Sequence, residues 1–373
     1  MRIGITCYPT YGGSGVIATE LGKFLARRGH EIHFIALDIP FRLQSFNGKF
    51  LFHEVEVVTY PLFEYNQPYA LNLAAKMSEV ITYQKLDILH VHYAIPHSIS
   101  AYLARQITHQ PIKIITTLHG TDITVVGNKP AFLPITQFGI DESDGVTAVS
   151  HYLSDRTYKT FGIKKKINVI HNFVDTKQYA YKPNPQLKMK FAPDGEKIIA
   201  HVSNFRPVKR LDNVIRVFAK IFEKVQAKLM LIGDGPERGK AEKMCRELDI
   251  CDHTIFMGKQ NAIHDFLSIS DLLICVSENE SFGLSVLEAM SCGVPVIASC
   301  VGGIPEIVIN EQQGFLLEPS DIDGFARAGI EILSNEALQK RMGMAGADRA
   351  KRYFDAEIIV PLYEQYYQKV LNQ

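Results

Sequence analysis

Short β-rich runs alternate with amphipathic segments of helical length along this chain, and that alternation restricts its fold more than any other feature. In the first half, strands are expected at 2–7, 31–37, 54–58, 87–92, 112–118, 145–149 and 167–170, and helices at 15–29, 68–84, 97–107 and 151–161. Strands that alternate with helices are typical of parallel sheets, because each crossover helix returns the chain to the same end of the sheet. The pattern therefore predicts an α/β fold.

A polar stretch with prolines at 176–195 interrupts the alternation, which then restarts. Further strands are expected at 197–203, 228–232, 254–257, 272–276 and 295–298, and further helices at 210–225, 236–248, 262–269 and 282–292. A chain of 373 residues is also long for one hydrophobic core. We predict two doubly wound, Rossmann-like domains, 1–170 and 171–354, facing one another across a ligand cleft. The last helical stretch, within 355–373, is expected to pack back on the first domain.

Composition narrows the classes of function. The formal net charge is zero, so no global field attracts nucleic acid or an anionic membrane, and local groups must hold any anionic ligand. No apolar run approaches the roughly 18 residues of a membrane span, and no signal-peptide hydrophobic region precedes the first strand. The six cysteines include no C-x-x-C pair, and Cys7, Cys275 and Cys300 are expected as buried thiols. We expect a cytoplasmic protein with neither a membrane span nor a nucleic-acid partner.

Glu280 and Glu288 flank a Ser-Phe-Gly turn that leads into an apolar helix. We expect Glu280 in the loop before this helix and Glu288 about two turns into it. Ionised carboxylates accept hydrogen bonds from vicinal hydroxyls, and helix N-terminal amides favour negative charge, so the pair suits a nucleotide sugar. The alternative is a solvated helix start with an acidic first turn.

Three basic residues, Arg206, Lys209 and Arg210, follow the first strand of the second domain at a helix start. Cations there oppose the helix dipole, so a bound diphosphate is the natural compensation, and a basic surface turn is the alternative. Two glycine turns, Gly233-Asp-Gly-Pro-Glu237 and Gly302-Gly-Ile-Pro-Glu306, follow other strands and are expected beside the ligand.

The glycine loop Tyr11-Gly-Gly-Ser-Gly15 lies between the first strand and the first helix. Glycines allow close backbone approach, and the helix N-terminus can bind an anion. Gly13–Ala18 also fits the loose pattern G-x-G-x-x-A, with Asp38 ending the second strand, so a dinucleotide site is an alternative. Against it, five residues including Pro9 separate the first strand from the first glycine of this pattern, whereas the dinucleotide turn is tight. No Gly-Lys-Ser/Thr follows, which excludes a Walker A loop.

His119 ends the strand expected at 112–118, where it can donate to a sugar hydroxyl or a phosphate oxygen, or serve as a structural histidine. His90 and His92 should share one face of a strand, with His97 nearby. No carboxylate ligand is obvious beside them, so structural or acceptor-facing roles are favoured over metal binding.

Taken together, these motifs resemble the retaining GT-B glycosyltransferases, in the expected order and over the whole chain. That family has two Rossmann-like domains and binds a nucleotide-sugar donor. The resemblance implies a catalytic group of His119, Arg206, Lys209 and Glu280. It implies a donor site formed by Gly13, Ser14, Gly15, Asn204, Gly233, Phe282, Gly283, Leu284 and Glu288, with no metal and no cofactor. Many relatives carry arginine where this chain has Asn204, and Arg206 is the nearest replacement.

A closer resemblance is to the members of this family that move GlcNAc from UDP-GlcNAc to the hydroxyl of L-malate and so open bacillithiol biosynthesis. It is carried by Ile5–Gly15, Ile39–Leu43, His92–His97 and Ser203–Arg210. It implies UDP-GlcNAc and L-malate as partners, and it is compatible with either a monomer or a homo-oligomer. The acceptor site is expected to use residues that follow strands, namely Ser14, Arg42, Tyr93 and Thr121, although Arg42 also fits a solvated loop. Two alternatives remain. One is a related retaining glycosyltransferase with another acceptor such as an inositol phosphate, and the other is an NAD-dependent dehydrogenase.

Overall fold

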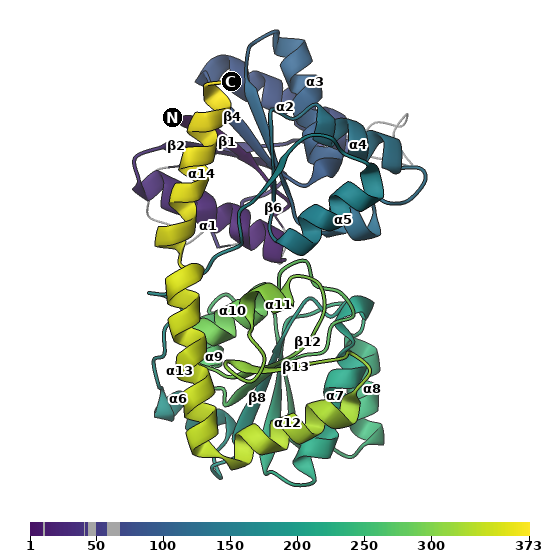
Figure 1. The fold of residues 1–373 in the computed structure, drawn as a ribbon, viewed down its shortest axis with the longest axis vertical. Coiled ribbons are helices and arrows are strands. Elements are labelled where there is room, and N and C mark those ends of the chain that lie inside the picture. The colour runs from purple at the N-terminus through teal and green to yellow at the C-terminus, as the bar shows by residue number, and fades with distance from the viewer. Residues whose placement is uncertain (10–11, 41, 44–49, 58–67) are drawn as a thin grey trace. The chain divides into compact units, whose positions relative to one another are not determined.

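The computed structural model describes residues 1–9, 12–40, 42–43, 50–57 and 68–373 (Figure 1). The chain forms two compact units. Unit 1 comprises Met1–Asn172 and Ile359–Gln373, and unit 2 comprises Phe173–Ile358. The division after Asn172 lies two residues beyond the boundary that the sequence suggested.

Unit 1 is built on a seven-stranded parallel sheet with the order β3-β2-β1-β4-β5-β6-β7. Its strands are β1 (Arg2–Thr6), β2 (Glu31–Ala36), β3 (Leu51–Glu54), β4 (Ile88–His92), β5 (Lys113–Leu118), β6 (Gly145–Ala148) and β7 (Ile167–Val169). Its helices are α1 (Gly13–Arg27), α2 (Tyr69–Gln84), α3 (Ile99–Thr108), α4 (Leu133–Asp141) and α5 (His151–Phe161), with single turns η2 (Ala94–Ser98) and η3 (Thr121–Val125). The strand order reverses between β1 and β4, and ligands of such sheets bind beyond the carboxyl ends of the strands at that point.

Unit 2 repeats this plan with a six-stranded parallel sheet of order β10-β9-β8-β11-β12-β13. Its strands are β8 (Lys197–Val202), β9 (Ala227–Ile232), β10 (Thr254–Gly258), β11 (Leu272–Cys275), β12 (Val296–Ser299) and β13 (Gly314–Leu317). Its helices are α6 (Pro185–Phe191), α7 (Leu211–Phe222), α8 (Arg238–Glu247), α9 (Ile263–Ser268), α10 (Leu284–Ser291), α11 (Ile304–Ile307), α12 (Ile322–Ser334) and α13 (Glu336–Tyr353), with turns η4 (Pro207–Lys209) and η5 (Cys251–His253). The order reverses between β8 and β11. The prediction of two doubly wound α/β domains is confirmed.

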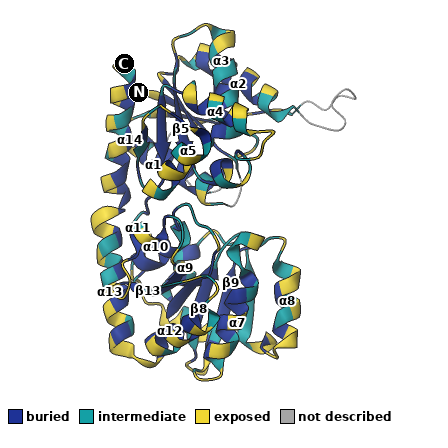
Figure 2. Ribbon diagram, turned by 45° about the vertical axis from the view of Figure 1, so that its right-hand side comes forward, coloured by how far each residue is buried: buried dark blue, intermediate teal, exposed yellow. Residues whose placement is uncertain are grey.

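Hydrophobic strands occupy the centre of each unit, where Figure 2 shows buried ribbon between helices whose outer faces are exposed. Strands β4, β11 and β12 are buried over their whole length, as expected for parallel strands covered on both faces. Helix α7 shows how the covering helices pack, because it buries one apolar stripe that includes Leu211, Ile215 and Phe218.

Helix α14 (Ala356–Leu371) carries the chain back, and its residues from Ile359 belong to unit 1. The Tyr367 hydroxyl lies 2.7 Å from Nδ1 of His90, and the Val146 N–H donates to the Tyr366 hydroxyl over 2.8 Å. Glu364 accepts from Arg28 over 2.7 Å. These contacts hold the C-terminal helix against the first sheet.

Apart from the glycine turn at 302–306, no element was expected between 298 and 355, and this region holds α11, β13, α12 and α13. The second sheet therefore extends by one strand, β13, beyond the last expected strand at 295–298. Strand β13 has only four residues, which is too short for a clear apolar run. In α13, close packing replaces large apolar side chains, since a Cβ on Gly343 would meet the Gly293 carbonyl oxygen at 2.1 Å. Helix α4 was also missed, and β3 is Leu51–Glu54, whereas the strand was expected at 54–58, of which residue 58 lies outside the described residues.

All six cysteines are free thiols, and Cys7 and Cys275 are buried as expected. Cys300 follows the end of β12 and is exposed, so its expected burial was wrong. Within the described part of the chain, no helix is both long and apolar enough to cross a membrane.

Candidate active site

In unit 2, the reversal of strand order brings the basic loop after β8 to the loop after β11. Lys209 lies in the first loop and Glu280 in the second, and their side chains form an ion pair between Nζ and Oε1. The sequence predicted both residues for one site but not their contact, which depends on β8 and β11 being neighbours.

The Lys209–Glu280 pair is mostly buried, with 20% and 13% of the two side chains exposed. Ser277, which follows β11 and was missed by sequence, donates from Oγ to the same Glu280 oxygen over 3.0 Å. Burial, the largest single effect, would lower the pKa of Lys209, but the interactions with Glu280 and Cys275 together outweigh it and the pKa is raised. Lys209 therefore carries a fixed positive charge at neutral pH.

The other two basic residues of this turn differ from one another. The Arg210 guanidinium pairs with Glu278 at 2.6 Å and with Asp212 at 3.1 Å, so two carboxylates already balance its charge, and a diphosphate at this basic turn stays a prediction. Arg206 is exposed and forms no ion pair with any described residue. Asn204 has a buried Oδ1 without a hydrogen-bond partner in the described part of the chain, a costly state that a ligand donor would relieve.

Two glycine turns pack against the backbone of these loops. Gly302 (φ 59°) lies so close that a Cβ would meet the Glu280 carbonyl oxygen at 1.7 Å, and the next N–H, of Gly303, donates to that oxygen over 2.9 Å. A Cβ added to Gly233 (φ 127°) would likewise meet the Ser203 carbonyl oxygen, at 1.8 Å. Larger residues would displace the loops that carry Glu280 and Asn204.

Glu288 lies on α10, where it is only 4% exposed. The helix begins at Leu284, with Gly283 in a left-handed conformation before it. Glu288 is therefore about one turn into the helix and not two as expected, because Ser281-Phe282-Gly283 precedes the helix. The prediction that Glu280 lies in the preceding loop is confirmed. The first amides of α10 have no partner within the helix and are suited to an acceptor group.

In unit 1, the glycine loop meets the residue that follows β4. Ser14 Oγ lies 2.5 Å from the Tyr93 hydroxyl. The Tyr93 ring centroid is 5.4 Å from that of His119, after β5, and 5.7 Å from that of Tyr8, after β1. Gly13 is exposed and Gly15 is buried. The ends of three strands thus gather hydroxyl and imidazole groups in one cluster.

His119 is held by a second histidine. Its Nε2 lies 2.8 Å from Nδ1 of His92, and the two rings stack with centroids 5.0 Å apart. Burial, with a smaller effect of His97, lowers the pKa of His119 to about 3, so the ring is neutral at physiological pH. His90 and His92 are buried and their rings stack at 4.5 Å, which confirms that they share one face of the strand.

Asp122, for which no role was predicted, ties together the loops after β4 and β5. Its Oδ1 accepts from the N–H groups of Gly120 at 2.8 Å and His119 at 3.2 Å, and its Oδ2 accepts from the Ala94 N–H at 2.8 Å. The sequence did contain a signal for this role, namely an acidic residue three positions after His119 in a glycine turn.

The remaining predicted acceptor residues occupy less defined surroundings. Thr121 is exposed and opens η3. Arg42 is half-buried with a left-handed φ of 70°, next to residues outside the described part of the chain. An acceptor role for either stays a prediction.

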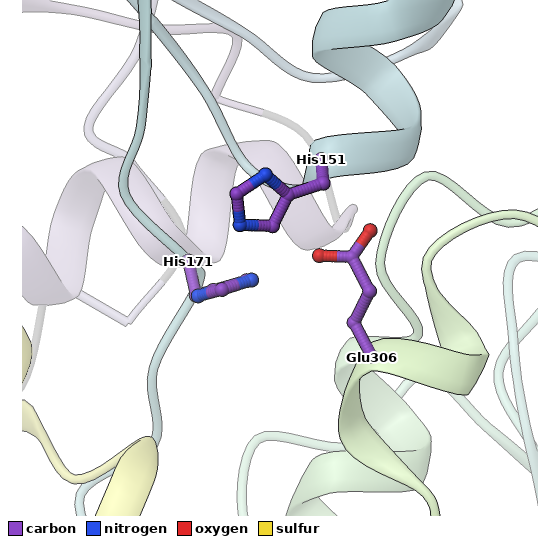
Figure 3. Close-up of side chains that lie close together, drawn as sticks. All are labelled: His151, His171 and Glu306. Atoms are coloured by element: carbon purple, nitrogen blue, oxygen red, sulfur yellow. The ribbon is translucent and has the colours of Figure 1, made fainter.

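Figure 3 shows His151 at the start of α5 and His171 in the segment after β7, with ring centroids 5.7 Å apart. Glu306, also drawn, belongs to α11 of unit 2. Because the positions of the units relative to one another are not determined, these three side chains define no metal site.

Family comparisons agree with the fold and the motifs. Residues 11–178 match the family described as Glycosyltransferase Family 4, and residues 185–349 match Glycosyl transferases group 1. Sucrose-phosphate synthase from Thermosynechococcus elongatus has the same fold, with a TM-score of 0.83 and 22% identity over 100% of this chain and 99% of that one. HepE from Anabaena, solved with UDP and glucose, gives 0.84 and 19% over 99% of each chain. The chain belongs to the glycosyltransferases of the GT-B fold.

Within that family, the chain is 49% identical to N-acetyl-alpha-D-glucosaminyl L-malate synthase of Bacillus anthracis, over 100% of this chain and 98% of the relative. It is 27% identical to D-inositol 3-phosphate glycosyltransferase of Mycolicibacterium smegmatis, over 75% of this chain and 67% of that protein. Membership of this family excludes the alternative interpretation of the chain as a dehydrogenase.

Proposed function

We propose that this protein is a retaining glycosyltransferase that moves GlcNAc from UDP-GlcNAc to the hydroxyl of L-malate, the first step of bacillithiol biosynthesis. The observation that carries the proposal is 49% identity over the full chain to a relative named for the malate product. The cytoplasmic location expected from the sequence is part of this proposal.

Unit 2 binds the donor in this proposal. Glu288 accepts from the ribose diol, and Glu280 accepts from sugar hydroxyls. The amides from Phe282 to Leu284, at the start of α10, donate to phosphate. The position of Glu288 supports its role, because it lies on α10, the helix whose N-terminal amides donate to the phosphate in this proposal.

Lys209 and Arg206 stabilise the departing UDP. The bond from the anomeric carbon to the phosphate oxygen breaks as the malate hydroxyl oxygen attacks from the same face, and the malate proton passes to a phosphate oxygen. Negative charge grows on UDP during this step, and fixed positive charge stabilises it. Lys209 is already charged and Arg206 has no carboxylate partner among the described residues, which supports these roles.

These cations and the α10 amides do the work that a divalent metal does in other transferases, so we propose a metal-independent enzyme. Activity should survive exhaustive treatment with EDTA. Loss of activity that returns on addition of Mg²⁺ or Mn²⁺ would contradict this assignment.

Unit 1 binds the acceptor through the glycine-loop amides and the side chains of Ser14, Tyr93, Thr121 and Arg42. These groups are donors, and a dicarboxylate offers acceptors at both ends. A monocarboxylate offers acceptors at one end only and would leave donors at the other end of the site without a partner, which sites of this kind reject strongly.

Mass spectrometry of the products tests the proposal. UDP-GlcNAc is incubated with L-malate, with lactate, or with an inositol phosphate. The proposal expects GlcNAc-malate and UDP, little product with lactate, and none with the inositol phosphate. Lactate turnover equal to that of malate would reject the acceptor site, and preference for the inositol phosphate would reject the function.

A further inference from the structure

We infer that His92 is a positioning residue that fixes His119 as the tautomer protonated on Nδ1, so that His119 offers a bound ligand a donor and not an acceptor. That the ligand is a substrate of the transfer reaction rests on the proposed function. The tautomer itself follows from contacts within unit 1.

The histidine cluster can be assigned because some partners have only one hydrogen-bonding role. His97 Nδ1 lies 2.5 Å from the carbonyl oxygen of His92, which can only accept, so His97 is protonated on Nδ1. Its Nε2 then accepts from the Tyr69 hydroxyl, 3.1 Å away. His97 therefore holds the backbone of His92 in place.

His92 has two nitrogens in very different surroundings. Nδ1 faces His119 Nε2 at 2.8 Å, whereas Nε2 is buried and has no partner in the described part of the chain. A proton on Nε2 would be a buried, unpaired N–H group, which is rarer and costlier than an unpaired acceptor. The proton therefore lies on Nδ1, and His92 donates to His119 Nε2.

The proton of His119 is then confined to Nδ1. The ring is neutral, because burial holds its pKa far below the ordinary value, and Nε2 is occupied as an acceptor. Although most of the ring is shielded, part of His119 remains exposed to solvent, and its Nδ1 makes no hydrogen bond to a described residue. This N–H is available at the carboxyl end of β5, beside Tyr93, for a hydroxyl, carbonyl or phosphate oxygen.

Two substitutions separate tautomer control from packing. The side-chain amide of His92→Asn reaches roughly the place of Nδ1 and can still donate, whereas His92→Leu cannot. In protein labelled with ¹⁵N-histidine, with the His119 signals identified by their loss in His119→Asn, we expect an Nδ1–H tautomer in the wild type and in His92→Asn. In His92→Leu we expect a shift toward Nε2–H.

Activity should follow the tautomer. If the competent tautomer falls to about a tenth, kcat/KM for UDP-GlcNAc in His92→Leu should fall roughly tenfold, and by much less in His92→Asn. His109→Asn is the matched control, because His109 is exposed and its left-handed backbone (φ 52°) suits asparagine.

An Nε2–H tautomer in the wild type, read without any substitution, would overturn the inference. So would a fully retained Nδ1–H signal in a folded His92→Leu protein. Failure of the proposed function would appear separately, as absence of GlcNAc-malate while the tautomer is as inferred.

Discussion

Replacing Lys209 by methionine removes the positive charge and keeps most of the side-chain length. The Lys209 and Glu280 side chains are only 20% and 13% exposed, so the substitution leaves a mostly buried Glu280 carboxylate uncompensated. Breaking a buried pair costs about 3–5 kcal/mol, and we expect about 3 kcal/mol because the hydrogen bond from Ser277 remains. The loss of one group that stabilises leaving-group charge should separately lower kcat roughly 100- to 1,000-fold, or about 3–4 kcal/mol.

A double-mutant cycle with Glu280→Gln separates these effects, using urea unfolding and UDP release at saturating donor. The double variant should recover most of the stability, because no buried charge is left unpaired, but none of the activity. Lys220→Met is the matched control, since Lys220 pairs with Asp323 where 49% and 68% of the side chains are exposed, and it should change neither by much. Near-normal turnover by folded Lys209→Met would refute the leaving-group role.

Three further outcomes are expected. Glu288→Ala should raise the KM for UDP-GlcNAc with kcat nearly intact, because the ribose does not react, and a fall in kcat alone would reject the ribose assignment. Arg42→Ala should raise the KM for malate and leave UDP-GlcNAc binding unchanged in calorimetry, and equal weakening of both would place it elsewhere. Burial lowers the pKa of His90 to about 3, and of His97 and His201 to about 4, from 6.5. The unfolded chain therefore binds more protons below pH 6.5, and stability should fall as the pH drops from 6.5 toward 4, by up to about 1.4 kcal/mol per pH unit for each histidine. Urea unfolding at pH 7 and pH 5 measures this, and equal stability at the two values would contradict it.

The strands and the site residues after them were accessible from sequence for one physical reason. Buried parallel strands read as apolar runs, and α/β sheets bind ligands just after such runs, so His119 and Glu280 were found at strand ends. Elements that pack without large apolar residues were not predicted, as α13 with its glycine contacts illustrates.

Contacts between loops were beyond sequence reasoning. Lys209 and Glu280 are 71 residues apart and meet only because β8 and β11 are neighbours. The same topology brings Glu278 to Arg210, whose charge is also balanced by Asp212, two residues further along the chain. The link from His92 to His119 likewise joins two adjacent strands.

The central claim is retaining transfer of GlcNAc to malate, and proton NMR of the purified product tests it most directly. UDP-GlcNAc carries an α-linked sugar, so retention predicts one GlcNAc-malate product with the small H1–H2 coupling of an α-glycoside. A β-linked product would contradict the same-face mechanism. Free GlcNAc and UDP without GlcNAc-malate would contradict the assigned acceptor.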